Sequence, residues 1–165
     1  MAITLRLGDS DEARQERTLP VWLVLDNLRS AYNVGNIFRV AEATRAAGIV
    51  TCGYTATPPH IKLQKTARGC DELVPCEHFD STAEAVASLR GRGMKVYAVE
   101  TVEESKLYWE APIELPCALV LGNEAHGVSR EMLEFADKRV RIEIQNIESL
   151  NVAIAGAIAM YELTK

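Results

Sequence analysis

The run Val21-Trp22-Leu23-Val24-Leu25, closed by Asp26-Asn27, decides how the chain folds. Consecutive apolar side chains leave no polar face, a pattern typical of a strand buried on both sides within a parallel sheet. Apolar residues then recur at i, i+3, i+4 and i+7 from Ile37 to Thr44, which is the spacing of one helical face. Gly48 is the candidate C-cap of that helix. The sequence therefore predicts a strand, a polar loop and a helix.

The same alternation of strand and helix continues to the C-terminus. We expect strands at 49–54, 95–99, 118–121 and near 140–144, and helices at 82–92, from Ser129, and from Asn151 to about 163. Strands separated by helical stretches favour a three-layer α/β fold, in which helices cover both faces of a parallel sheet. Residues 1–20 are polar and charged, so we expect an N-terminal arm followed by a single domain over 21–165.

Composition and charge narrow the class of protein. The 165 residues carry 18 Lys and Arg against 23 Asp and Glu, and a net charge of −5 favours a small-molecule partner over nucleic acid. The chain has no apolar run of about 20 residues and no apolar N-terminal signal segment, which excludes a membrane span and predicts a cytoplasmic protein. Four cysteines without paired or C-x-x-C spacing are expected to be reduced thiols.

Polar, glycine-containing segments follow three of the predicted strands. They run from Asp26 to Gly35, from Gly122 to Gly127, and from Gln145 to Asn151. Ligands of open α/β sheets bind beyond the carboxyl ends of the strands, where such loops meet. The chain lacks both G-x-G-x-x-G and the P-loop pattern, so a dinucleotide or nucleoside triphosphate site is not expected.

These three loops resemble the three motifs of the SpoU (TrmH-like) branch of the SPOUT RNA methyltransferases. The matching segments are Asn33-Val34-Gly35-Asn36-Ile37-Phe38-Arg39, Leu119 to Ser129, and Ser149 to Ala155, in the same order as in the family. The resemblance covers residues 21 to about 163. It implies a SPOUT α/β knot with a C-terminal trefoil knot, S-adenosylmethionine as cofactor, methylation of a ribose 2′-OH in tRNA or rRNA, and a homodimer. We expect no metal.

The resemblance also implies a catalytic set. Its members are Asn33, Arg39, Glu124, Ser149 and Asn151. A guanidinium stays protonated at neutral pH, so Arg39 is better suited to clamp a phosphate and stabilise the developing alkoxide than to act as a base. Each residue also has a structural alternative. These are an ion pair of Arg39 with Glu42, helix capping by Asn33, Ser149 or Asn151, and a solvated loop carboxylate at Glu124.

Two binding sets complete the prediction. The resemblance assigns the cofactor to loop backbones and apolar walls at Leu121, Gly122, Asn123, Ile142, Ile144, Ser149 and Leu150. Basic side chains that could contact RNA are Arg29, Lys62, Lys65 and Arg68, with Arg6, Arg14 and Arg17 in the arm. Because the chain is acidic, RNA would be met by a local basic patch built from two chains. His126 has no metal-ligand spacing and receives no role.

Two other functions stay open at this point. One is a non-catalytic RNA-binding protein that retains the fold, and the other is a methyltransferase acting on an RNA base. Asn33 and Arg39 argue against the first, and nucleoside analysis of the methylated RNA separates the second from ribose methylation.

Overall fold

Strand β1 (Leu19–Asp26) lies inside the sheet of the computed structural model, which describes residues 16–102 and 105–165. It pairs in parallel with β2 (Ala46–Cys52) on one side and with β6 (Cys117–Gly122) on the other. Within the described residues, seven strands form one sheet in the order β3-β2-β1-β6-β4-β7-β5, and all their pairings are parallel. The strand predicted from the 21–25 run is therefore confirmed.

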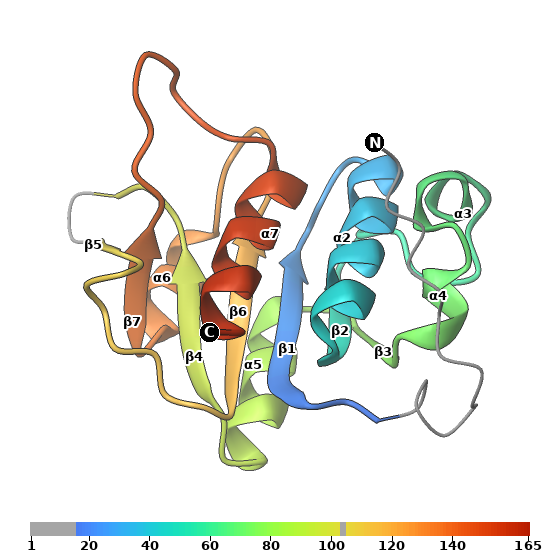
Figure 1. The fold of residues 1–165 in the computed structure, drawn as a ribbon, viewed down its shortest axis with the longest axis horizontal. Coiled ribbons are helices and arrows are strands. Elements are labelled where there is room, and N and C mark those ends of the chain that lie inside the picture. The colour runs from blue at the N-terminus through green and yellow to red at the C-terminus, as the bar shows by residue number, and fades with distance from the viewer. Residues whose placement is uncertain (1–15, 103–104) are drawn as a thin grey trace.

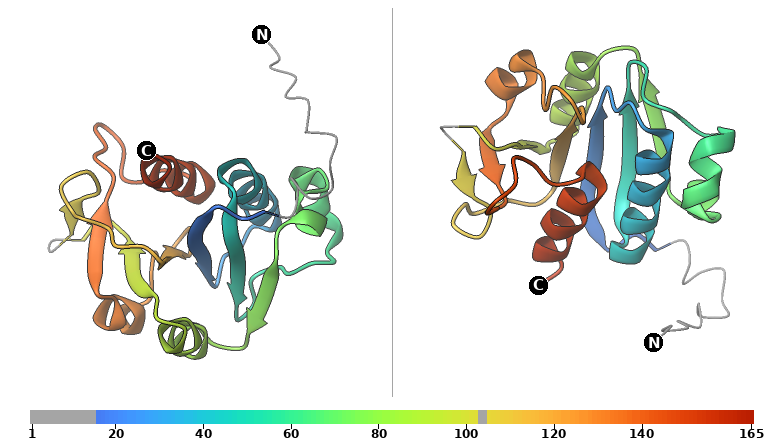
Figure 2. Two further views of the ribbon diagram at one scale, coloured as in Figure 1. Left: turned by 60° about the horizontal axis from the view of Figure 1, so that its bottom comes forward. Right: turned by 90° about the horizontal axis from the view of Figure 1, so that it is seen from above.

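Helices cover both faces of this sheet (Figures 1 and 2). Helices α2 (Ala31–Thr44) and α7 (Val152–Leu163) lie side by side on one face, and α5 (Thr82–Gly91) and α6 (Arg130–Phe135) cover the other. The remaining elements are α3 (Ile61–Ala67), α4 (Cys70–Leu73), β3 (Cys76–Phe79), β4 (Lys95–Val99), β5 (Lys106–Leu107) and β7 (Lys138–Arg141). This arrangement confirms the predicted three-layer parallel α/β fold.

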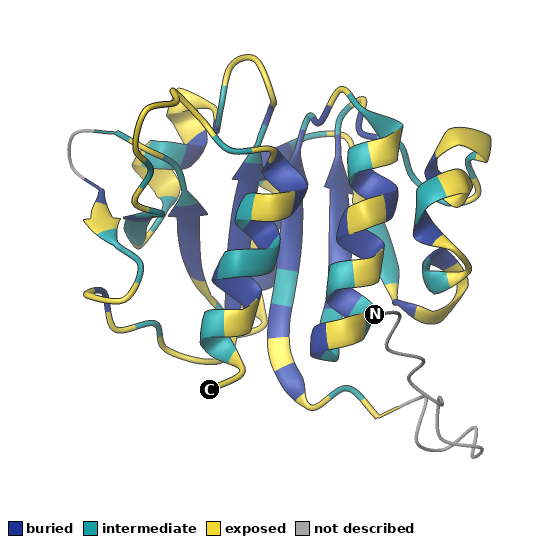
Figure 3. Ribbon diagram, turned by 45° about the horizontal axis from the view of Figure 1, so that its top comes forward, coloured by how far each residue is buried: buried dark blue, intermediate teal, exposed yellow. Residues whose placement is uncertain are grey.

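The side chains of β1 divide the interior into two cores. Leu23 and Leu25 pack with Phe38 of α2 on one face, while Val24 packs with Leu89 of α5 on the other. All five side chains are buried, and Figure 3 shows the central strands largely in dark blue behind helices α2 and α7. Burial on both faces explains why the strand reads as an uninterrupted apolar run.

Helix α2 ends earlier than predicted. Its C-cap is Arg45, which adopts the left-handed conformation with φ 58°, whereas Gly48 lies within β2. A Cβ at Gly48 would approach the ring of Trp22 to 2.4 Å, so this glycine makes room for an aromatic side chain. The predicted C-cap at Gly48 is therefore wrong, because the glycine serves packing within the sheet.

Residues 61–79 hold elements that periodicity did not predict. Helices α3 and α4 and strand β3 are too short to produce a clear apolar period. Helix α3 packs against α2 at Gly35, where a Cβ would come within 2.0 Å of Oγ1 of Thr66 and 2.3 Å of the Leu63 carbonyl oxygen. The glycine of the first motif is thus required for contact between two helices.

The strand predicted near 140–144 is β7, and it lies at Lys138–Arg141. Val140 is its last residue paired with β4, opposite Val99, and Arg141 ends its pairing with β5. Both partner strands end there, so the chain leaves the sheet before Ile142. The long loop from β7 to α7 then stands above the carboxyl edge of the sheet (Figure 1).

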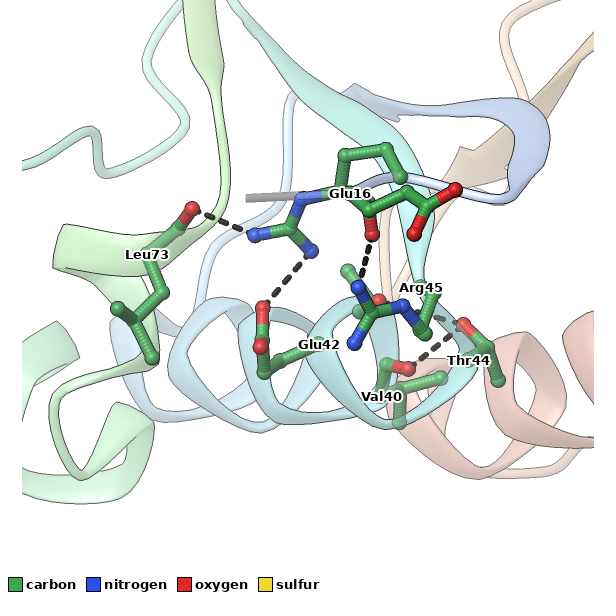
Figure 4. Close-up of polar contacts among 8 residues, drawn as sticks. Glu16, Val40, Glu42, Thr44, Arg45 and Leu73 are labelled. Atoms are coloured by element: carbon green, nitrogen blue, oxygen red, sulfur yellow. Dashed lines mark hydrogen bonds and ion pairs between the residues drawn. The ribbon is translucent and has the colours of Figure 1, made fainter. Parts of the chain in front are cut away.

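The described end of the predicted arm packs against the domain. An Nη atom of Arg17 lies 2.7 Å from a carboxylate oxygen of Glu42, and the same guanidinium donates to the Leu73 carbonyl (Figure 4). Arg45 donates to the carbonyl of Glu16. Arg17 is therefore committed to its own chain, and Arg6 and Arg14 lie outside the described residues. The division at residue 20 remains a prediction, and β1 already begins at Leu19.

Other sequence predictions concern the whole chain. No helix among the described residues is long and apolar enough to cross a membrane. All four cysteines are free thiols, and burial raises the pKa of Cys52 and Cys117 to about 12. Burial also raises the pKa of Cys76, which makes that thiol a poor nucleophile. The C-terminal trefoil knot implied by the resemblance remains a prediction.

Candidate functional site

The carboxyl ends of β1 and β6 meet at the point where strand order reverses, and a pocket of about 450 Å³ opens there. We call it the strand-end pocket. It contains every residue predicted to bind the cofactor: Leu121, Gly122, Asn123, Ile142, Ile144, Ser149 and Leu150. Asn33, Glu124 and Asn151 of the predicted catalytic set line it as well. The structure therefore brings the three motif loops to one place.

A chain of side-chain hydrogen bonds joins the three motifs. Nδ2 of Asn151 donates to Oδ1 of Asn33 at 3.1 Å, and Nδ2 of Asn33 donates to Oε1 of Glu124 at 3.1 Å. Oδ1 of Asn151 also accepts from the backbone N–H groups of Ala153 and Ile154. Asn151 is thus both the N-cap of α7 and the link to the first motif.

The capping alternatives are settled by this geometry. Ser30 caps α2, because its hydroxyl accepts from the backbone N–H of Asn33 at 3.2 Å. Asn33 is therefore free of the capping role and spans the gap between Glu124 and Asn151. Ser149 is not the cap of α7 and lies exposed on the wall of the strand-end pocket.

Glu124 fastens the second motif to the first. Its carboxylate accepts from the backbone N–H of Arg29 at 2.8 Å and from that of Ser30 at 3.1 Å, in addition to Asn33. Partial burial raises the pKa of this carboxyl, but the hydrogen bonds from Arg29, Asn33 and Ser30 outweigh it and leave the pKa below its usual range. Glu124 is thus an exposed carboxylate that three donors hold in place.

This network predicts a pH dependence of stability. Because folding lowers the pKa of Glu124, the carboxylate stabilises the fold at neutral pH, and this stabilisation is lost as pH falls below about 4.5. We expect Glu124→Gln to lower the free energy of unfolding by about 1 kcal/mol at pH 7, a value reduced by the exposure of the side chain. Urea unfolding from pH 7 to pH 3 should show the difference from wild type shrinking; parallel curves would contradict the prediction.

Asn123 holds its own loop. Its buried amide donates from Nδ2 to the Asn27 carbonyl and to the Tyr54 hydroxyl, each at 2.8 Å, and Oδ1 accepts from the backbone N–H groups of Ala125 and His126. All four hydrogen-bonding capacities of the amide are therefore used. Its backbone N–H also donates to the Gly127 carbonyl and its carbonyl accepts from the Gly127 N–H, so Asn123 shapes the loop and offers no free donor to a ligand in the strand-end pocket.

Gly122 and Gly127 let the second loop fold back on itself. A Cβ at Gly122 would lie 2.1 Å from the backbone nitrogen of Val128, and one at Gly127 would lie 2.1 Å from Oε2 of Glu100. Oε2 of Glu100 accepts from that same nitrogen of Val128 at 2.9 Å. Gly122 therefore permits close contact between backbone segments of the loop.

Glu100 is a pocket residue that the sequence analysis missed. It is the first residue after β4, so the rule that directed attention to the other strand ends applies to it equally. Together with Glu124 and Glu148 it gives the lining of the strand-end pocket three carboxylates and no lysine or arginine. Such a lining favours a cationic ligand and disfavours a polyanion.

Arg39 lies outside the strand-end pocket. It follows Asn33 by about 9 Å along α2, on the exposed face of that helix, and does not line the pocket. Its predicted alternative, an ion pair with Glu42, is absent from the described part of the chain, where Glu42 pairs with Arg17 (Figure 4). Arg39 shares an exposed stripe of α2 with Tyr32 and Asn36.

The predicted RNA-binding residues lie on and beside a second pocket. This pocket, about 610 Å³, has Arg29 and Lys62 in its wall, together with Tyr32 and Tyr54, and we call it the tyrosine pocket. Lys65 and Arg68 are exposed on and just after α3 but do not line it. No cluster of three His, Cys, Asp or Glu side chains suited to a metal occurs within 16–102 and 105–165.

The chain is thus a parallel α/β protein whose candidate ligand pocket is built from three linked loops at the carboxyl ends of the strands. The model of the SpoU rRNA methylase family matches residues 20–161. The chain belongs to this family.

Similar proteins are named as RNA methyltransferases. The chain is 28% identical over its whole length to the 23S rRNA (guanosine-2′-O-)-methyltransferase RlmB of Vibrio parahaemolyticus, covering 67% of that protein. An AdoMet-bound rRNA methyltransferase from Sinorhizobium meliloti superposes with a TM-score of 0.81 at 28% identity, over 90% of this chain and 57% of the other. A solved structure whose description concerns the 2-OH methylation of C/U34 on tRNA superposes with a TM-score of 0.76 at 28% identity. The match covers 87% of this chain and 88% of the other.

Relatives differ in length. Among four curated relatives that the chain matches, it spans between 41% and 67% of their own lengths. The shared part is thus the domain that carries the three motifs.

Proposed function

We propose that this protein is an S-adenosylmethionine-dependent RNA methyltransferase that modifies a ribose 2′-OH. The observation that carries the proposal is the hydrogen-bonded chain Asn151–Asn33–Glu124, which joins all three family motifs at one pocket. Relatives named as 2′-O-methyltransferases support the type of reaction.

The strand-end pocket fits the proposed cofactor in size and chemistry. Its volume of about 450 Å³ is within the usual range for small-ligand sites. Ile142, Ile144 and Leu150 supply apolar walls suited to adenine, and the carboxylates of Glu100 and Glu124 suit a ligand that carries a sulfonium and an ammonium group. The bound cofactor would supply an activated methyl group. The S. meliloti relative, described as AdoMet-bound, supports this assignment.

The residues around the pocket position the acceptor. Asn33 and Asn151 fix the first and third loops relative to each other, and the exposed hydroxyl of Ser149 lies on the same wall, where it can orient a ribose. A guanidinium suits the binding of an RNA phosphate and the stabilisation of negative charge that develops on the 2′ oxygen during methyl transfer. We assign that role to Arg39.

The position of Arg39 favours a homodimer, since the residue does not line the pocket of its own chain. Apart from Glu162, helix α7 carries only apolar or aromatic side chains, and Ile154 and Tyr161, seven residues apart on one face, are 53% and 52% exposed. Helix α2, with Arg39 on its exposed face, packs beside α7 (Figure 2). Pairing two chains through this surface would cover the apolar face and bring Arg39 toward a site of the partner.

If the exposed face of α7 forms the dimer interface, a substitution there should change the mass of the protein in solution. We expect Ile154→Glu to convert a dimer into a monomer, because a carboxylate would be buried without a partner. Light scattering coupled to size-exclusion chromatography measures the change, and Phe135→Glu, an equally exposed apolar residue on the opposite side of the sheet, is the control that should stay dimeric. Identical masses for wild type and Ile154→Glu would contradict the prediction.

The substrate is proposed as tRNA or rRNA, following the two kinds of RNA named for the relatives. An RNA substrate and four free cysteines together favour the cytoplasm as its location.

Methylation with labelled S-adenosylmethionine tests the proposal. Tryptophan fluorescence or calorimetry should report binding of the cofactor, and incubation with unmodified tRNA and rRNA followed by nucleoside analysis should yield a 2′-O-methylnucleoside. A base-methylated nucleoside would reassign the acceptor, and RNA binding without cofactor binding would favour a non-catalytic RNA-binding protein.

A further inference from the structure

The tyrosine pocket is built differently from the strand-end pocket. Its lining includes the cationic side chains of Arg29 and Lys62 and contains no acidic residue, although the chain as a whole carries a net charge of −5. The strand-end pocket has the opposite character, with three glutamates and no lysine or arginine. An acidic protein thus separates a site suited to a cation from a site suited to an anion.

Tyr54 is an exposed aromatic ring held in a fixed position. Its side chain is 64% exposed, yet its hydroxyl accepts from Nδ2 of Asn123 at 2.8 Å and its backbone N–H donates to Oδ1 of Asn27 at 3.2 Å. Gly53, with φ 61°, leaves room for the Asn27 side chain, since a Cβ there would lie 1.9 Å from Oδ1 of Asn27. A ring that is both exposed and anchored offers a stacking surface at little entropic cost.

The floor of the tyrosine pocket is also held in place by hydrogen bonds. The buried hydroxyl of Thr55 donates toward the carbonyl oxygens of Leu25 and Cys52, and accepts from the backbone N–H of Leu28 at 3.0 Å. These contacts fasten the loop after β2 to the end of β1. The pocket is therefore preformed.

Two histidines in the lining present one ring nitrogen each. Nδ1 of His78 lies 2.9 Å from Oγ1 of Thr51, and Nδ1 of His60 accepts from the backbone N–H of Leu63. In the described part of the chain, Nε2 of either ring has no hydrogen-bond partner. Each imidazole is thus oriented by a hydrogen bond within the chain, and its Nε2 can still form a hydrogen bond with a ligand.

Hydrogen bonds join the lining of the tyrosine pocket to that of the strand-end pocket. Tyr54 of the tyrosine pocket is hydrogen-bonded to Asn123 of the strand-end pocket, and Ser30 of the tyrosine pocket to Glu124 of the strand-end pocket. A nucleotide whose base occupies the tyrosine pocket would therefore hold its ribose close to the strand-end pocket.

We propose that the tyrosine pocket binds an unpaired base of the RNA substrate, stacked on Tyr54, at or beside the methylated nucleotide. This inference rests on the proposed function. Exposed aromatic rings beside cationic groups are the usual means by which proteins hold single-stranded RNA, because a base stacks on the ring while the cations meet its phosphates. Tyr32 lines the same pocket and is 45% exposed. It begins the exposed stripe of α2 that carries Arg39, so the RNA strand would leave the pocket along that helix.

Three variants test this pocket: Tyr54→Ala, Tyr54→Phe and, as control, Phe135→Ala on the opposite face of the sheet. We expect Tyr54→Ala to raise the KM for RNA by about 10- to 100-fold, as for the loss of one base–aromatic stack, with the affinity for S-adenosylmethionine unchanged. Tyr54→Phe keeps the ring and should stay within about threefold of wild type, as should the control.

Two kinetic results would overturn the proposal. One is an active Tyr54→Ala variant with an unchanged KM for RNA. The other is an equal loss of cofactor affinity in Tyr54→Ala and Tyr54→Phe, which would make Tyr54 a structural support of the Asn123 loop.

Photocrosslinking separates this inference from the proposed function. Total RNA labelled with 4-thiouridine is bound to the wild-type protein, irradiated and digested, and we expect the crosslinked tryptic peptide to be 46–62, which contains Tyr54 and His60. Failure to methylate any RNA would overturn the proposed function while leaving this crosslink measurable. Crosslinks confined to peptides outside 46–62 and the α2 stripe would overturn the base pocket even in an active methyltransferase.

Discussion

Replacing Arg39 with alanine is expected to lower kcat for methyl transfer by about 100- to 1000-fold, with the affinity for S-adenosylmethionine unchanged. The magnitude is that of removing one charge-stabilising donor from a reacting oxygen. Cofactor affinity is expected to be unaffected because the role assigned to Arg39 is toward the RNA, and the residue does not line the strand-end pocket of its own chain. Single-turnover methylation of saturating RNA, together with calorimetric titration of the cofactor, measures the two quantities separately.

Two matched variants give this result its meaning. Arg39→Lys keeps the charge but loses the paired donors of the guanidinium, so it should recover only part of the activity. Lys65→Ala removes another exposed cation, from the neighbouring helix α3, and should change the KM for RNA by no more than a few-fold. Full activity of Arg39→Ala would contradict this prediction, because it would show that Arg39 does not stabilise charge in the reaction.

Replacing Gly122 with alanine is expected to cost about 1 to 3 kcal/mol of unfolding free energy and at least tenfold in cofactor affinity. The new Cβ would lie 2.1 Å from the backbone nitrogen of Val128 and 2.2 Å from the carbonyl carbon of Gly127. Neither is a flexible side-chain end, so the loop itself must move. Since Gly122 and Gly127 both line the strand-end pocket, that movement changes the cofactor site.

Gly91 supplies the control for this substitution. It is the last residue of α5, where a Cβ would meet nothing within 4 Å. Gly91→Ala should therefore leave cofactor affinity unchanged and alter stability by no more than about 0.5 kcal/mol. Thermal unfolding and calorimetric titration of both variants make the comparison, and equal behaviour of Gly122→Ala and Gly91→Ala would contradict the role of the folded-back loop.

The sequence predicted the place of the site because parallel strands share one carboxyl edge. Loops that follow apolar runs must meet there, which is why residues as distant as Leu121 and Leu150 could be assigned to one pocket. Glu100 follows the predicted strand 95–99 and could have been found by the same reasoning. The resemblance to a family directed attention to the motif loops and away from this strand end.

Contacts within the site could not be predicted from the sequence. Asn33 bonds to Glu124 across 91 positions and to Asn151 across 118, and no local pattern encodes such pairs. The capping preference of asparagine suggested a different role, which Ser30 takes instead. Gly35 and Gly122 both lie in the motif segments of the sequence. Only the packing shows that Gly35 faces helix α3 and that Gly122 faces the backbone of Gly127 and Val128.

Net charge is a poor guide to the partners of a protein because it averages over the whole surface. The acidic residues include three in the lining of the strand-end pocket, while the lining of the tyrosine pocket includes Arg29 and Lys62 and no acid. A protein with a net charge of −5 can therefore offer a local site for a polyanion, and its binding should weaken as salt screens the few contacts.

Mapping of 2′-O-methyl groups across tRNA and rRNA, in cells with and without this protein, tests the central claim most directly. We predict that a small number of ribose methylations disappear with the protein, return when the wild-type chain is restored, and do not return with Arg39→Ala. An unchanged set of 2′-O-methyl groups in its absence would contradict the assignment of this protein as a ribose methyltransferase.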